Sequence, residues 1–128
     1  MEQWWLRQKL TCDETKADYI IILEDDVYVK NKFDIVEDFS LRGARIGNNF
    51  SSSVSEQINN SHYGMCGGSI YNASVLKQIY DDVIVDIRRH HDKLLNDKAY
   101  FELGAVDANI TYHFNKRGYK YEISPWMV

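Results

Sequence analysis

The sequence predicts an α/β domain, because short apolar runs typical of strands alternate along the chain with segments of helical periodicity. The length of 128 residues suits a single domain. Apolar residues make up 45% of the chain and aromatic residues 13%, which is enough for a hydrophobic core and excludes a disordered chain. We therefore expect residues 1–128 to form one domain.

The first half of the chain predicts two helices and two strands. Residues 2–16 read as an amphipathic helix. Tyr19–Leu23 is apolar on both faces, as a central strand covered on both sides requires. A short helix over residues 31–39 is expected to end by Gly43, and Ala44–Gly47 reads as a weak second strand.

The second half predicts two further helices and a last strand. Residues 47–62 form a polar loop, and residues 63–71 lead to Asn72, which is placed to cap a helix. A final helix over residues 105–117 should stop at Gly118, before a strand over residues 119–123. The apolar face of the helix after Asn72 consists of Val75, Leu76, Ile79, Tyr80, Val83 and Ile87.

Charge and composition exclude several classes of protein. With 15 Lys and Arg against 19 Asp and Glu, the net charge of −4 argues against binding to nucleic acid or anionic membranes. The longest apolar run, Tyr19–Leu23, is far shorter than the roughly 20 residues of a membrane span. No signal peptide is visible, and Cys12 and Cys66 read as buried free thiols, so we expect a soluble cytoplasmic chain.

Three consecutive acids, Glu24, Asp25 and Asp26, follow the most apolar strand directly. In open α/β sheets, ligands bind at the carboxyl ends of the strands. A divalent cation would relieve the repulsion between the carboxylates, and Mg²⁺ commonly combines protein carboxylates with substrate phosphates. The alternative is an acidic turn in solvent.

The segment from Tyr19 to Lys30, with its Glu24-Asp25-Asp26 triplet, resembles the D-x-D region of GT-A glycosyltransferases in its E-D-D variant. The resemblance implies a GT-A-like mixed sheet flanked by helices. It also implies that Asp26 binds Mn²⁺ or Mg²⁺ and that Glu24 and Asp25 lie toward the donor sugar nucleotide.

Two further segments follow in the order that this family would place them. Ala44–Gly47 resembles the strand after the D-x-D hairpin, and Gly64–Ser69 resembles the small-residue segment beside the donor sugar. The resemblance assigns Gly67, Gly68 and Ser69 to donor binding, since glycine lets a backbone approach a ligand closely. A bulged strand or tight turn would also account for the glycines.

Asp107 falls within the inward arc of the last predicted helix, with Leu103, Val106, Ile110 and Phe114. Burying an unpaired carboxylate is costly, so a functional partner is expected. By resemblance, Asp107 is the general base that deprotonates the acceptor hydroxyl. Glu102 is the competing candidate, and either acid would also serve as a helix cap.

Other metal-binding or sugar-stacking residues are less specific. His113 fits an edge-of-core histidine better than a metal ligand, and the pair His90-His91 lacks a third ligand. Trp4, Trp5 and Trp126 suit either the core or a sugar-stacking platform.

Only 18 residues precede Tyr19, which is too few for the βαβ unit that binds the nucleotide base in GT-A enzymes. We therefore expect a domain truncated at its N-terminus, with the flank of Tyr19–Leu23 covered by a missing N-terminal half or by a homodimer partner.

Together these features predict a metal-dependent glycosyltransferase, or its catalytic half, that moves a sugar from a UDP- or GDP-sugar to a glycan or other hydroxyl acceptor. Asp107 as base implies inversion at the anomeric carbon. The alternative is a non-catalytic structural or interaction module with the same fold, which the short N-terminus favours.

Overall fold

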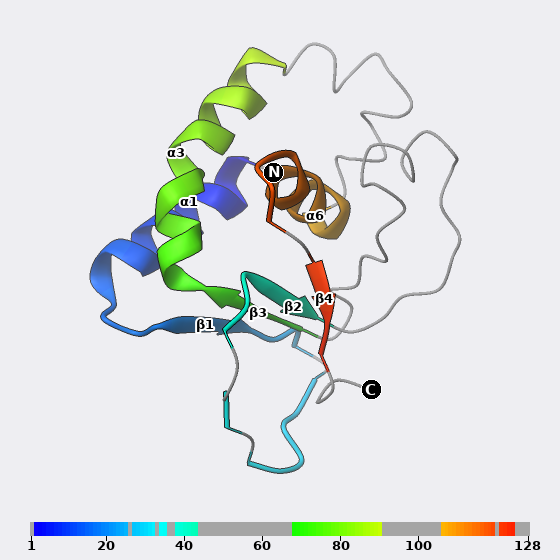
Figure 1. The fold of residues 1–128 in the computed structure, drawn as a ribbon. Coiled ribbons are helices and arrows are strands. Elements are labelled where there is room, and N and C mark those ends of the chain that lie inside the picture. Colours follow the sequence, from blue (N-terminus) through cyan, green and yellow to red (C-terminus); the bar gives the residue numbers. More distant parts are fainter. Residues whose placement is uncertain are drawn as a thin grey trace.

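The protein is an α/β domain in which helices α1, α3 and α6 lie on one face of a small mixed sheet (Figure 1). This computed structural model describes residues 2–25, 27–32, 34–35, 38–43, 68–90, 106–119 and 121–124. Its elements are α1 (Glu2–Glu14), β1 (Tyr19–Ile22), β2 (Leu41–Gly43), β3 (Ser69–Asn72), α3 (Ala73–Arg89), α6 (Val106–Lys116) and β4 (Tyr121–Ile123).

The described strands pair in the order β1-β3-β2-β4. Strand β3 is antiparallel to both β1 and β2, whereas β2 and β4 are parallel. It follows that β1, β2 and β4 all run in one direction and that their carboxyl ends lie at one edge of the sheet. The predicted α/β class is confirmed by this arrangement.

Local sequence signals fix the helix ends. Asn72 caps α3, because its Oδ1 accepts hydrogen bonds from the amides of Ser74 at 3.0 Å and Val75 at 3.2 Å. After α6 the chain turns at Gly118, whose φ of +84° favours glycine. Both ends agree with the sequence prediction.

The core lies between the helices and the sheet. Seven of its largest members are fully buried: Trp5, Leu41, Tyr71, Leu76, Val83, Ile110 and Phe114. The prediction that α3 buries one apolar face is confirmed, and Trp5 is a core residue. Trp4 is partly buried against the same core, Cys12 is a buried free thiol, and Cys66 and Trp126 lie outside the described residues.

The prediction that Tyr19–Leu23 is a central strand covered on both sides is wrong. Within the described sheet β1 is an outer strand that pairs with β3 alone, and Ile21 is 45% exposed. The apolar run signalled a tendency to be buried but carried no information about which segments pair with it.

Two boundaries also differ from the prediction. The second strand is Leu41–Gly43 rather than Ala44–Gly47, which lies outside the described residues together with the polar loop over 47–62. None of the described residues between 31 and 39 is helical. Phe39 instead packs against Tyr19, with the ring centroids 5.0 Å apart, so tertiary contacts there replace helical periodicity.

No helix within the described ranges is both long enough and apolar enough to cross a membrane.

Candidate functional site

The carboxyl ends of three strands meet in one row at the candidate site. Ile22 of β1 is opposite Ser69 of β3, Ser69 is also opposite Gly43 of β2, and Gly43 is opposite Ile123 of β4. The acidic segment that follows β1 therefore begins at the sheet edge where ligands bind in open α/β sheets.

Glu24 and Asp25 are exposed at this edge. The chain turns there, because the Val27 amide donates a hydrogen bond to the Glu24 carbonyl at 3.2 Å. Neither carboxylate has an ion-pair partner among the described residues, and Asp26, the predicted metal ligand, lies outside them. Two carboxylates accessible to solvent suit Mg²⁺ or Mn²⁺, which favour oxygen ligands.

No three His, Cys, Asp or Glu side chains gather into a metal-binding group in the part of the chain that the structure describes. Because Asp26 is not among those residues, the metal site stays a prediction.

Gly68 lies directly against the end of β1. A Cβ at this position would meet the Ile22 carbonyl oxygen and Leu23 Cδ2, each at 3.0 Å. The φ of Gly68 is +144°, in a region that other residues rarely adopt. The structure thus places Gly68 against Ile22 and Leu23, directly before the acidic segment, and this β1–β3 contact by itself already requires a glycine here.

Replacing Gly68 with alanine should therefore lower the free energy of unfolding by about 3 kcal/mol, through the unfavourable φ and the contact with Ile22. Urea denaturation measures the loss. Gly118→Ala is the control, since Gly118 also has a positive φ but a Cβ added there would meet no atom within 4 Å. Equal losses of unfolding free energy in the two variants would show that the close contact between Gly68 and β1 does not contribute to stability.

Ser69 is fully buried, and its Oγ donates a hydrogen bond of 2.7 Å to the Tyr71 hydroxyl. Its side chain is thus directed toward the core, so any contact of Ser69 with a donor would come from its backbone. Gly67, the third member of the predicted donor-binding segment, lies outside the described residues.

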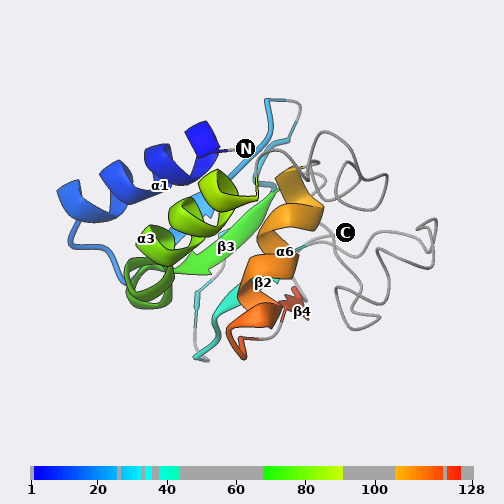
Figure 2. The same cartoon turned by 90° about the horizontal axis from the view of Figure 1, so that it is seen from above.

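Asp107 belongs to the first turn of α6. Seen from above, α6 begins over the edge of the sheet at which β3 begins (Figure 2). Ile110 and Phe114 are fully buried, as predicted for the inward face of this helix. The structure does not describe Glu102 and Leu103, nor the side chains of Val106 and Asp107. Which acid is the general base, Asp107 or Glu102, therefore stays a prediction.

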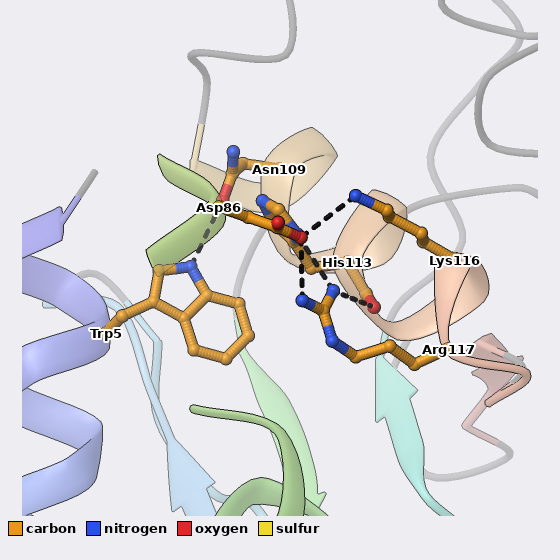
Figure 3. A network of polar contacts seen from close by, with 6 residues as sticks. All are labelled: Trp5, Asp86, Asn109, His113, Lys116 and Arg117. Atoms are coloured by element: carbon orange, nitrogen blue, oxygen red, sulfur yellow. Dashed lines mark hydrogen bonds and ion pairs between the residues drawn. The ribbon is translucent and has the colours of Figure 1, made fainter. Parts of the chain in front are cut away.

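A polar network that the sequence analysis missed joins α3 to the end of α6 (Figure 3). Asp86 Oδ2 accepts hydrogen bonds from Lys116 at 2.9 Å and Arg117 at 2.8 Å, and its side chain is only 17% exposed. Burial opposes ionisation of Asp86, but the hydrogen bonds from Lys116 and Arg117 outweigh it and lower the pKa of the carboxyl. The sequence did contain one signal for this network: Asp86 lies three residues after Val83, and therefore beside the apolar face of α3.

His113 is also part of this network and is a core histidine, as its sequence context favoured. It is 4% exposed, and Arg117 Nη1 lies 3.2 Å from its Nδ1. Because a guanidinium only donates, Nδ1 accepts, and the neutral ring carries its proton on Nε2. Burial, reinforced by the charge of Arg117, lowers the pKa of His113 to about 3. The network therefore stabilises the packing of α3 against α6.

A hollow of about 480 Å³ lies at the opposite edge of the sheet, near the start of α3. Lys16, Asp18, Asp38 and Lys77 line it. Asp38 Oδ1 already accepts hydrogen bonds from Tyr19 and Asn72, at 3.2 and 3.1 Å. The hollow is thus separated from the acidic edge by the length of the strands.

Comparisons of this chain with protein-family models, with curated proteins and with solved structures gave no match.

Proposed function

We propose that the chain is a metal-dependent glycosyltransferase of GT-A type, or the catalytic half of one. It would transfer a sugar from a UDP- or GDP-sugar to a hydroxyl group of a glycan or another acceptor. The observation that supports the proposal is the position of Gly68 against Ile22 and Leu23, directly before the acidic segment at the carboxyl edge of the sheet.

Each residue has a distinct role in this proposal. Asp26 would hold Mn²⁺ or Mg²⁺, which when bound stabilises the charge of a departing diphosphate, and Glu24 and Asp25 would assist at the donor sugar nucleotide. The backbone of Gly67, Gly68 and Ser69 would lie against the donor sugar. Asp107 accepts the proton of the acceptor hydroxyl, which is the role of a general base.

Calorimetric titration with UDP- and GDP-sugars, with and without Mn²⁺, tests the donor site. We expect Mn²⁺-dependent binding by the wild-type chain and a loss of at least about tenfold in affinity in Asp26→Ala. Asp82→Ala is the matched control, because Asp82 is an exposed acid on α3. Equal affinities for Asp26→Ala and the wild type would reject the metal assignment, and no binding by either would support a non-catalytic module.

The same preparation separates donor binding from transfer. Asp107→Asn should keep the Mn²⁺-dependent binding and lose sugar transfer, because asparagine has no basic carboxylate. Turnover at the wild-type rate in Asp107→Asn would remove Asp107 as the base.

A further inference from the structure

The outer side of β1 presents backbone groups with no strand beside them in the described sheet. The Ala73 amide donates to the Asp18 carbonyl at 2.9 Å, so Asp18 and then Ile20 and Ile22 direct their backbone groups toward β3. By alternation, the N–H and C=O of Ile21 point away from β3. Such an edge pairs readily with another strand.

Most of the large apolar side chains that are exposed among the described residues belong to β1 or to the segment of chain that follows it. Four of the six large apolar residues exposed among the described ones are Ile21 at 45%, Leu23 at 43%, Tyr28 at 74% and Val29 at 53%. The other two, Leu10 and Val85, lie on α1 and α3. Ile21 and Leu23 thus leave apolar surface exposed on β1 and directly after it, which is typical of an interaction surface.

Charges at the two ends of β1 suit a second copy of the same strand. Lys16 precedes β1 and Glu24 follows it, and both are exposed without an ion-pair partner among the described residues. In an antiparallel pair of β1 with itself, centred on Ile20, Lys16 of each copy is directly opposite Glu24 of the other. Directly opposite residues project on the same face of a sheet, so two complementary pairs form by symmetry.

We infer that β1 pairs antiparallel with β1 of a second copy, in the register that places Ile20 opposite Ile20. The alternative register centred on Ile21 places Asp18 opposite Glu24, which is a like-charge pair and unfavourable. The chosen register joins the two sheets into one and covers the exposed edge. It also brings Lys16 of the second copy beside the acidic end of the first.

Analytical ultracentrifugation over a concentration series tests the dimer. The wild type should dimerise, and Ile21→Lys should raise the dissociation constant at least about tenfold, because the symmetric interface receives two new charges. Val85→Lys is the control, since Val85 is 50% exposed on α3. A monomeric wild type, or equal dimerisation of the two variants, would overturn the inference.

Mixing two charge variants tests the register. Lys16→Glu and Glu24→Lys should each dimerise more weakly than the wild type, because each creates two like-charge pairs with its own copy. Mixed together, they should form a heterodimer, since Glu at position 16 then faces Lys at position 24 and Lys16 faces Glu24. A mixture that associates no better than its components would overturn the proposed register. Circular dichroism confirms that both variants are folded, and the result does not depend on sugar transfer.

Discussion

Replacing Trp5 with alanine should lower the free energy of unfolding by about 3–5 kcal/mol, because a large, fully buried ring is removed. Trp5 joins α1 to α6: its ring centroid lies 6.4 Å from that of Phe114 and 5.9 Å from that of His113. Its Nε1 also donates a hydrogen bond of 3.1 Å to Asn109 Oδ1, in the close-up of Figure 3. Chemical denaturation followed by circular dichroism measures the loss.

Two other variants separate packing from hydrogen bonding at this position. Trp5→Phe keeps an aromatic ring but removes the donor to Asn109, which is 2% exposed, so we expect a smaller loss of about 1–3 kcal/mol. Leu10→Ala on the same helix should change stability by less than about 1 kcal/mol, because Leu10 is 58% exposed. Comparable losses in Leu10→Ala and Trp5→Ala would contradict the assignment of Trp5 to the core.

Acidification should destabilise the protein already at pH values well above those at which carboxylates titrate. In the unfolded chain His113 takes up a proton near pH 6.5, whereas in the folded protein its pKa is about 3. Between these values only the unfolded state binds the proton, so the free energy of unfolding falls by about 1.4 kcal/mol per pH unit as the pH decreases. The loss attributable to His113 reaches about 2 kcal/mol at pH 5.

Urea denaturation at several pH values between 7 and 5 measures this slope in the wild type and in His113→Gln. The variant should lack the dependence, whatever its absolute stability, while His90→Gln should retain it as the control. The lowered pKa of Asp86 acts in a lower window: its contribution is present above about pH 4 and is lost as the pH falls further. An unchanged slope in His113→Gln would mean that another group causes the acid sensitivity.

The features predicted correctly from the sequence depend on neighbours along the chain. Asn72 and the apolar residues spaced around 3.6 apart define α3 without reference to any other segment. Gly118 likewise marks the turn after α6 by its own backbone conformation. Such signals are readable because the residues involved interact within one or two helical turns.

The errors concern pairing between distant segments. Nothing in the run Tyr19–Leu23 specifies that β3 pairs with one of its sides while no strand of the described sheet pairs with the other, because strand order depends on the whole sheet. The Asp86–Lys116 ion pair likewise joins two segments that are distant in the sequence, the helices α3 and α6. In the candidate site, the acidic triplet and the glycines were recognisable as motifs, whereas the position of Gly68 against Ile22 and Leu23 follows from the strand pairing.

The parallel pairing of β2 with β4 has a consequence for synthesis of the protein on the ribosome. One edge of β2 pairs with β4, residues 121–123. A nascent chain that ends before these residues therefore leaves that edge of β2 unpaired. Contacts of such long sequence separation are slow to form, and unpaired edges in partly folded chains favour aggregation. Productive folding of the sheet therefore waits for translation of β4, and chaperones that shield strand edges would act on the chain before that point.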